Sequence, residues 1–417
     1  MDKMVVVGGK TLNGEVRTSG AKNSALKVLF STILAEGTHR FQNVPDLKDI
    51  QSTSELLASL GIHCERQGQD FLVHSGSLKS MEASYDLVRK MRASILCLGP
   101  MLAKYGEAVV SLPGGCAIGS RPIDLHIEGM KALGAEIELK EGYVRAKAKK
   151  LKGTTFLFEN ITVGGTENVM MAATLAEGTT ILENVAKEPE IIDLAEYLNK
   201  MGAKITGHGT AVMKIEGVEK LKPASHSVMP DRIEAGTLLI AGAITGGEVT
   251  VTDCVPHHIE SLIFKLKEAG FKISTTANSV TVHPLKQWEA VDITTSPYPQ
   301  FPTDLQAQFM SLMTVANGTS VISETVFENR FMHVQELMRL GADITPKSRV
   351  AVVRGNPNGL TGAPVMATDL RASACLVLAG LVAKGETTIN RIYHLDRGYE
   401  KMEVKLGKLG ASISRKS

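Results

Sequence analysis

The sequence is poor in aromatic residues, carries little net charge and has no long apolar run. Aromatic residues make up 5% of its 417 positions, and Trp288 is the single tryptophan, which argues against a stacking platform for single-stranded nucleic acid. The formal net charge of +2 gives no bulk attraction to nucleic acid or to a membrane surface. The longest apolar run, residues 372–383, is too short to span a bilayer, and the first ten residues have no signal-peptide core. We therefore expect a globular protein with no nucleic-acid partner and no membrane insertion.

Cysteine is also scarce, and it is scattered along the chain. There are five cysteines and no Cys-x-x-Cys pair: Cys64, Cys97, Cys116, Cys254 and Cys375. An odd number without paired spacing favours free thiols in a reducing compartment and argues against a zinc site. We expect a cytoplasmic protein with no bound metal.

Glycine, by contrast, is abundant and recurs with a period. A phrase typical of a helix end, an apolar residue followed by glycine and a strand-like run, occurs six times. Its glycines recur at nearly equal intervals: Gly61, Gly134, Gly202, Gly270, Gly341 and Gly410. A second glycine precedes each of them, again at a similar interval: Gly37, Gly106, Gly178, Gly247, Gly318 and Gly385. The chain therefore consists of six repeated units of roughly 70 residues each.

Each unit contains two helices of different kinds. The second is amphipathic, as in residues 191–201, whereas the first is apolar nearly all round, as in residues 233–244 and 372–382. A helix that is apolar on every face belongs inside a protein. We predict an α/β fold in which buried helices are surrounded by sheets, an inside-out α/β barrel. A solenoid of stacked repeats is the alternative.

One unit carries an insertion that contains a cysteine. The interval between the two marker glycines is longest in the unit of Gly106 and Gly134. The extra residues fall in a glycine-rich loop that reads Leu-Pro-Gly-Gly-Cys over residues 112–116, with Arg121 five positions further on. Glycine lets a ligand approach the backbone, and a nearby cation favours the thiolate. Cys116 is thus a candidate reactive residue, and an incidental surface cysteine is the alternative.

The buried helices begin with charged residues. Asp231, Asp304 and Asp369 stand where a helix N-cap is expected. Cations at this end of a helix oppose its dipole and need another role. Four such cations are present: Lys22, Arg92, Arg232 and Arg371. Several helix N-termini with cations beside them form an anion site, which a phosphorylated, carboxylated substrate would fit.

Eight segments carry a more specific pattern: residues 20–26, 91–94, 112–116, 119–126, 301–304, 324–330, 367–373 and 396–399. They read GAKNSAL, MRAS, LPGGC, GSRPIDLH, FPTD, ETVFENR, ATDLRAS and DRGY. In this order they resemble the family of UDP-N-acetylglucosamine enolpyruvyl transferases over the whole chain. The resemblance implies two inside-out α/β domains of three units each, one spanning residues 22–229 and the other combining residues 1–21 with 230–417.

The resemblance also implies a reaction and the residues that perform it. The enolpyruvyl group of phosphoenolpyruvate passes to the 3′-hydroxyl of UDP-N-acetylglucosamine with release of phosphate, the first committed step of peptidoglycan synthesis. Cys116 corresponds to the general acid, which can also carry a covalent phospholactoyl adduct, and Asp304 corresponds to the base beside the sugar hydroxyl. As a helix N-cap, Asp304 would be compatible with that role.

The remaining implied roles concern binding. The residues implied to hold phosphoenolpyruvate and stabilise its charge are Lys22, Asn23, Arg121 and Arg397. Those implied to bind the sugar nucleotide are Arg92, Arg121, Pro122, Ile123, Asp124, Leu125, Thr162, Val163, Gly164, Asp304 and Val326. Asp369 and Arg371 are implied to support closure of the site and the orientation of its cations.

The resemblance implies no metal and no cofactor, and it predicts that fosfomycin alkylates Cys116. Two alternatives stay open. One is an enzyme like enolpyruvylshikimate phosphate synthase, with a smaller acceptor; the other is a non-catalytic relative that binds the sugar nucleotide. The Gly-Gly-Cys loop argues against the first, and the complete set of candidate residues argues against the second.

Overall fold

The computed structural model describes residues 2–89, 91–112 and 123–416, which divide into two compact units. The middle unit comprises the described residues between 20 and 229, and the split unit comprises residues 2–19 and 230–416. Each unit has its own apolar core. Along the described residues, the chain passes between the units at Ser19–Gly20 and at Met229–Pro230. Beside these passages, Ala21 N donates to Met229 O at 2.7 Å and Asp231 N donates to Ser19 O at 2.9 Å.

Among the described residues, each unit contains three four-stranded sheets, and all six sheets share one pattern of strand pairing. One outer pair of strands in each sheet is parallel, and the other neighbours are antiparallel. The middle unit has β14 (Ser225–Ser227)–β3 (Gly37–Gln42)–β5 (Asp70–Ser75)–β4 (His63–Gln67), β6 (Glu82–Ala83)–β7 (Glu107–Ser111)–β9 (Tyr143–Lys147)–β8 (Glu136–Lys140) and β10 (Thr155–Leu157)–β11 (Thr179–Glu183)–β13 (Val212–Glu216)–β12 (Lys204–Thr206). The split unit has β16 (Ile273–Thr275)–β17 (Ser279–Val282)–β15 (Val249–Thr252)–β2 (Gly14–Arg17), β18 (Ile293–Thr294)–β19 (Thr319–Ser323)–β21 (Val350–Arg354)–β20 (Asp343–Lys347) and β22 (Pro364–Met366)–β23 (Glu386–Asn390)–β1 (Lys3–Val7)–β24 (Ser412–Lys416).

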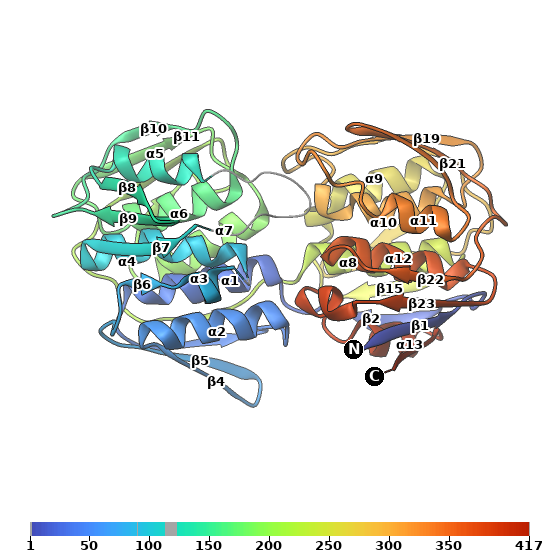
Figure 1. Ribbon diagram of the computed structural model, residues 1–417, viewed down its shortest axis with the longest axis horizontal. Coiled ribbons are helices and arrows are strands. Elements are labelled where there is room, and N and C mark those ends of the chain that lie inside the picture. Colours follow the sequence, from blue (N-terminus) through green and yellow to red (C-terminus); the bar gives the residue numbers. More distant parts are fainter. Residues whose placement is uncertain (1, 90, 113–122, 417) are drawn as a thin grey trace. The chain divides into compact units, whose positions relative to one another are not determined.

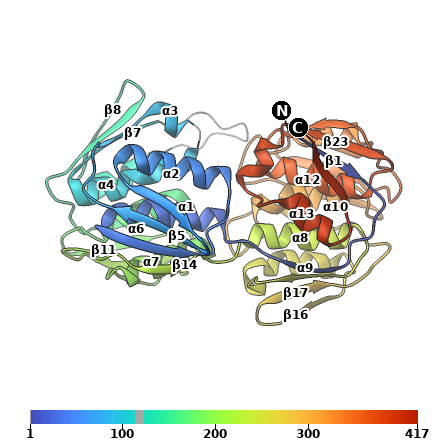
Figure 2. The ribbon, with the colours of Figure 1, turned by 90° about the horizontal axis from the view of Figure 1, so that it is seen from below.

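Three strands are supplied by distant parts of the chain. Strand β2 comes just before the first helix of the middle unit in the sequence, but it pairs with β15 of the split unit. Strand β14 comes just before the first helix of the split unit, but it pairs with β3 of the middle unit. Strand β1 lies between β23 and β24, with Lys3 facing Lys416. The two ends of the chain therefore lie side by side in one sheet (Figure 2). Strands β2 and β14 each end within three residues of a point where the described chain crosses from one unit to the other.

The first helix of each repeat is buried inside its unit, as the sequence predicts. In the middle unit these helices are α1 (Lys22–Ser31) followed by η1 (Thr32–Leu34), η2 (Arg92–Cys97) followed by α4 (Leu98–Tyr105), and α6 (Val163–Ala173). In the split unit they are α8 (Arg232–Ile244), η4 (Thr303–Leu305) followed by α10 (Gln306–Met313), and α12 (Leu370–Val382). Every residue of α8 is buried. Helices α8, α10 and α12 pack against one another inside their three sheets (Figure 1). The predicted inside-out α/β fold is confirmed.

The second helix of each repeat packs on the outside with one face buried. These helices are α2 (Lys48–Leu60), α5 (Asp124–Ala132), α7 (Pro189–Lys200), α9 (Glu260–Glu268) after η3 (Pro256–Ile259), α11 (Val334–Arg339), and α13 (Met402–Lys408) after η5 (Ile392–Arg397); α3 (Tyr85–Val88) is a further single turn. Each of the six predicted marker glycines that follow them has a left-handed φ between 93° and 104°. Glycine adopts this conformation without a steric penalty, so the repeat marks six helix ends correctly.

One marker glycine was assigned wrongly. The left-handed residue after α8 is Gly246, with φ of 68°, rather than the predicted Gly247. Gly247 is needed for a different reason, because a Cβ atom there would lie 1.8 Å from the backbone oxygen of Leu12. Two adjacent glycines thus serve two purposes, which the spacing alone did not separate.

Candidate active site

Three of the predicted site residues, Cys116, Arg121 and Pro122, lie outside the described residues. Their roles therefore stay predictions. The other predicted residues are placed in one unit or the other, and each group is described within its own unit.

In the middle unit, several of the predicted ligand residues lie at the N-terminal ends of the inner helices. Lys22 and Asn23 begin α1, and Arg92 begins η2. Lys22 is buried, with its Nζ atom 3.2 Å from Asp49 Oδ2. The α6 helix begins at Val163, next to Thr162, whose hydroxyl accepts a hydrogen bond from Gly165 N at 3.2 Å. Backbone N–H groups and cations at these ends suit phosphate and carboxylate groups.

The predicted run from Ile123 to Leu125 lies at the start of α5. Ile123 precedes the helix, and Asp124 is the acidic residue of its first turn. An acidic residue is favourable at this end of a helix dipole. The same turn carries His126, the last residue of the GSRPIDLH segment, for which the sequence predicts no role.

His126 is a candidate ligand residue that sequence reasoning missed. Its side chain is buried, and its Nδ1 atom lies 3.0 Å from Asn168 Nδ2. The amide of Asn168 is fixed in orientation because its Oδ1 accepts from Gly99 N at 2.7 Å and its Nδ2 donates to Ile95 O at 3.1 Å. His126 Nδ1 must therefore be the acceptor, which places the proton on Nε2.

The protonated Nε2 atom of His126 faces the predicted diphosphate segment. A Cβ atom on Gly164 would lie 3.2 Å from it, so glycine keeps this approach open. Burial, assisted by the charge of Arg92, lowers the pKa of His126 to about 4. At neutral pH the ring is an uncharged donor beside the start of α6. The sequence does contain a signal for His126, because it directly follows Asp124 and Leu125, which are both predicted ligands.

In the split unit, Asp304 is held by two arginines. Arg330 donates to its Oδ1 at 2.8 Å, and Arg371 donates to its Oδ2 at 2.8 Å and 3.2 Å. Burial opposes ionisation of Asp304, but the two guanidinium groups outweigh it and hold its pKa well below the usual value. The carboxylate is therefore ionised at any physiological pH, and its side chain remains 26% exposed.

The expectation that Asp304 is a helix N-cap is wrong. No side-chain cap hydrogen bond is formed at the start of η4 or of α10. The arginines take up both carboxylate oxygens instead. The other two aspartates do cap helices: Asp231 accepts from the backbone of α8, and Asp369 accepts from Arg371 N at 2.8 Å. The Asp369 cap fixes the first turn of α12, from which Arg371 reaches Asp304.

Aromatic rings support the two arginines. The guanidinium of Arg371 lies 5.4 Å from the ring centre of Tyr399, and that of Arg330 lies 5.1 Å from the ring centre of Phe327. These are cation–π distances. Arg330 ends the ETVFENR segment, and it is a second functional candidate that sequence reasoning missed.

Glu324 connects this cluster to the loop that carries Val326. Its buried carboxylate accepts from the hydroxyls of Thr295 and Thr303 at 2.8 Å each. It also accepts from the backbone of Val326 at 2.8 Å and of Phe327 at 3.2 Å. One side chain therefore positions both Val326, which is 38% exposed, and the residue before Asp304.

The last predicted residue of the split unit, Arg397, ends η5. No group of three metal-binding side chains occurs among the residues that the structure describes. Over the same part of the chain, the helices are too short or too polar to cross a membrane.

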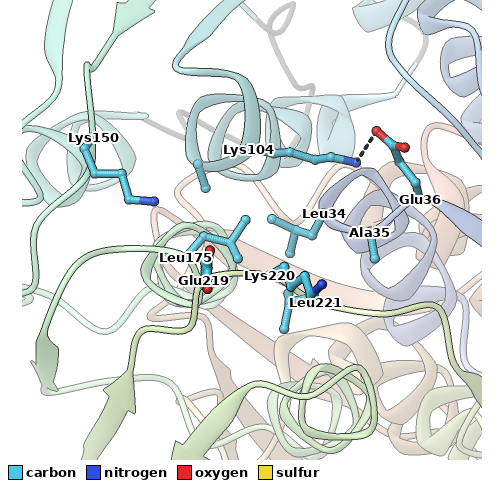
Figure 3. Close-up of a pocket in the computed structure, with 10 residues that line it drawn as sticks. Leu34, Ala35, Glu36, Lys104, Lys150, Leu175, Glu219, Lys220 and Leu221 are labelled. Carbon is cyan, nitrogen blue, oxygen red and sulfur yellow. Dashed lines mark ion pairs between the residues drawn. The ribbon is translucent and has the colours of Figure 1, made fainter.

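A cavity of about 310 Å³ lies in the middle unit, and none of the residues that line it is a predicted site residue. Figure 3 shows the lining residues. Leu34, Lys104 and Leu175 line it at the C-terminal ends of the inner helices, whereas Lys22, Arg92 and Val163 lie at the N-terminal ends. Lys104 forms an ion pair with Glu36 at 3.6 Å across its rim (Figure 3). The lining charges nearly balance: Lys104, Lys150 and Lys220 against Glu36 and Glu219. We assign no ligand to it.

The chain is similar in sequence to known proteins over nearly its whole length. The family described as EPSP synthase (3-phosphoshikimate 1-carboxyvinyltransferase) matches residues 6–406. The UDP-N-acetylglucosamine 1-carboxyvinyltransferase of Bdellovibrio bacteriovorus is 75% identical over 412 residues, covering 99% of this chain and 100% of that protein. The chain belongs to the enolpyruvyl transferase family. A protein of the same name from Myxococcus xanthus is 57% identical to this enolpyruvyl transferase over 418 residues, covering 100% of this chain and 99% of the relative.

Solved structures of enolpyruvyl transferases have the same fold. The enolpyruvyl transferase NikO from Streptomyces tendae superposes with a TM-score of 0.89 at 27% identity, covering 99% of this chain and 98% of that one. EPSP synthase from Acinetobacter baumannii superposes with a TM-score of 0.76 at 18% identity over the full length of both chains, which shows the shared fold alone. The predicted family and fold class are confirmed.

Proposed function

We propose that this enolpyruvyl transferase transfers the enolpyruvyl group of phosphoenolpyruvate to the 3′-hydroxyl of UDP-N-acetylglucosamine and releases phosphate. The observation that carries the proposal is the full-length match to relatives named UDP-N-acetylglucosamine 1-carboxyvinyltransferase. The reaction is then the first committed step of peptidoglycan synthesis. We assign it to the cytoplasm, and the four described cysteines are free, as a reducing compartment favours.

The anionic ends of the substrates are assigned to the cations. Phosphoenolpyruvate is held by Lys22, Asn23, Arg121 and Arg397. The diphosphate of the sugar nucleotide lies at the start of α6, beside Thr162, Gly164 and the Nε2–H of His126. Support for this assignment comes from the helix N-termini and buried cations of the middle unit. Arg92 and the segment from Arg121 to Leu125 complete the nucleotide side, and Val326 contacts the sugar.

The addition step needs two proton movements, and the reaction needs no cofactor. Cys116 protonates the methylene carbon of phosphoenolpyruvate, while the sugar 3′-oxygen attacks the adjacent carbon and gives its proton to Asp304. The product of this addition is a tetrahedral intermediate that still carries the phosphate. Elimination breaks the carbon–oxygen bond to phosphate, which leaves with the bonding electron pair. A proton of the methyl group returns to the Cys116 thiolate, which restores the double bond. Lys22 and Arg397 stabilise the phosphate and carboxylate charges in both steps.

The contacts of Asp304 determine how it acts as a base. Because Arg330 and Arg371 stabilise its ionised form, Asp304 accepts a hydrogen bond from the sugar hydroxyl at any physiological pH. The same stabilisation makes it a weak base. It therefore takes up the proton as the new carbon–oxygen bond forms, when the hydroxyl becomes acidic, rather than before.

The test is phosphate release in the presence of both substrates, with shikimate 3-phosphate as a competing acceptor. Release should require UDP-N-acetylglucosamine, and release with shikimate 3-phosphate instead would favour the EPSP synthase reaction. Binding of the sugar nucleotide without turnover would favour a non-catalytic relative.

A cysteine pair separates the role of Cys116 from general thiol chemistry. Cys116→Ser should abolish most turnover and prevent covalent modification by fosfomycin. Cys64→Ser is the control, because burial raises the pKa of the Cys64 thiol to about 12 and leaves it unreactive. Fosfomycin adduct formation on the Cys116→Ser protein would contradict the assignment.

A further inference from the structure

Two charged side chains are buried together between α1 and α6 of the middle unit. Glu167 is 0% exposed and Lys27 is 8% exposed. Lys27 Nζ lies 3.3 Å from Glu167 Oε1 and donates a hydrogen bond of 2.6 Å to the backbone oxygen of Asn23. Within the described part of the chain, neither oxygen of Glu167 accepts a hydrogen bond. A buried ion pair with so few hydrogen bonds is weak as a stabilising element, so it needs another explanation.

The pair lies next to the turn of α1 that carries two of the residues assigned to phosphoenolpyruvate. Lys22 and Asn23 form the first turn of α1, and Lys27 follows one turn later on the same helix. The Lys27 side chain therefore reaches back to the turn that presents them. An ammonium group near a helix N-terminus opposes the helix dipole, and Glu167 supplies the compensating charge.

We propose that Lys27 and Glu167 form a positioning pair that holds the first turn of α1 and sets the charge behind the phosphoenolpyruvate end of the site. The inference rests on the proposed function, because it takes Lys22 and Asn23 as ligands of that substrate. Lys27 acts through the Asn23 carbonyl, and Glu167 acts through Lys27.

The neighbours of Glu167 make its charge variable near neutral pH. Burial raises its pKa to about 7; Lys27 opposes this shift, and Glu190 and Glu188 at the start of α7 add to it. The adjacent face of α6 meets His126 of α5 through Asn168, and that ring is uncharged at neutral pH. Below pH 7 Glu167 is neutral and the charge of Lys27 is uncompensated, whereas above pH 7 the pair is neutral overall.

An anionic substrate should therefore bind this end of the site more weakly as the pH rises through 7. Glu167→Gln imitates the neutral carboxyl group at every pH. At pH 6 the variant and the wild type should have equal KM for phosphoenolpyruvate, and at pH 8.5 the variant should have a KM about threefold to tenfold lower. Taking the ratio of the two proteins at each pH cancels the ionisation of the substrate itself.

Lys27→Met tests the positioning half of the proposal. It removes both the cation and the hydrogen bond to Asn23, so KM for phosphoenolpyruvate should rise about tenfold at both pH values, with a smaller change in kcat. Glu234→Gln is the matched control, because Glu234 pairs with Lys405 at 2.7 Å and is buried, but in the split unit. Its KM ratio to the wild type should be independent of pH. Thermal unfolding of each variant checks that it is folded.

The outcomes separate this inference from the proposed function. A Glu167→Gln ratio that stays constant from pH 6 to 8.5, or a folded Lys27→Met protein with wild-type KM, overturns the positioning pair. Failure of the wild type to release phosphate counts against the proposed function instead. In that case NMR of the full chain decides on the pair: the Glu167 carboxyl carbon and the Asn23 amide should titrate together near pH 7, and the Asn23 titration should vanish in Glu167→Gln. An Asn23 amide that does not follow Glu167 overturns it.

Discussion

Replacing Glu324 by glutamine should loosen the split unit around Asp304. The carboxylate is 1% exposed and accepts four hydrogen bonds, two from threonine hydroxyls and two from backbone N–H groups. Glutamine keeps the size of the side chain but removes its charge and turns one acceptor into a donor. That donor would face Thr303, whose hydroxyl already accepts from Arg330 at 2.8 Å.

The expected loss of unfolding free energy follows from the number of hydrogen bonds that Glu324 accepts. A hydrogen bond to a charged group stabilises a protein by about 1 kcal/mol more than one to a neutral group, so four weakened bonds amount to about 3–5 kcal/mol. This is at the upper end of what single substitutions do. Displacement of Thr303 should also misplace Asp304, and kcat/KM should fall about 10- to 100-fold.

Urea unfolding, followed by tryptophan fluorescence, measures this change in the free energy of unfolding directly. Trp288 is the single tryptophan, it is buried in the split unit, and its Nε1 donates to Leu312 O at 3.2 Å. Its fluorescence therefore reports on the unit that contains Glu324. Glu248→Gln is the control, since this carboxylate is 56% exposed in the same unit and should change the unfolding free energy by less than about 0.5 kcal/mol. A loss below about 1 kcal/mol for Glu324→Gln, with unchanged activity, would refute the reasoning.

Three further predictions concern single side chains. Asp304→Asn should lower kcat at least about 100-fold while the protein stays folded, measured by phosphate release, because it removes the proton acceptor and leaves two arginines without their carboxylate; wild-type kcat would exclude the base role. Gly164→Ala should raise KM for UDP-N-acetylglucosamine about tenfold with little change for phosphoenolpyruvate, because its Cβ would crowd His126; equal changes for both substrates would argue against the diphosphate assignment. Burial lowers the pKa of His39 from 6.5 to about 4, so its contribution to stability is present above pH 6.5 and lost as the pH falls toward 4, at most about 3 kcal/mol. His39→Gln should flatten the pH dependence of unfolding between pH 7 and 4, followed by circular dichroism, and an unchanged slope would contradict the burial argument.

The repeat made the fold predictable from the sequence. Glycines that end helices in a left-handed conformation recur in all six units, and their spacing alone indicates how many units there are. The apolar character of residues 233–244 and 372–382 placed these helices inside. What the spacing missed was local, as at Gly246 and Gly247, where two glycines meet different requirements.

The candidate site was predictable only in part, because its partners are distant in the sequence. Asp304 stands where a cap is expected, but Arg330, 26 residues away, and Arg371, 67 residues away, take its carboxylate. No short stretch of sequence shows that two distant arginines bind this carboxylate in place of the helix backbone. His126 shows the same limit, since its proton is placed by Asn168, 42 residues away.

The central claim is the chemistry, and product analysis tests it most directly. Wild-type protein incubated with phosphoenolpyruvate and UDP-N-acetylglucosamine should release one phosphate for each sugar nucleotide that gains a three-carbon enolpyruvyl group, and NMR should place that group on the 3′-oxygen. An unmodified sugar nucleotide, or phosphate release that does not depend on it, would contradict the claim.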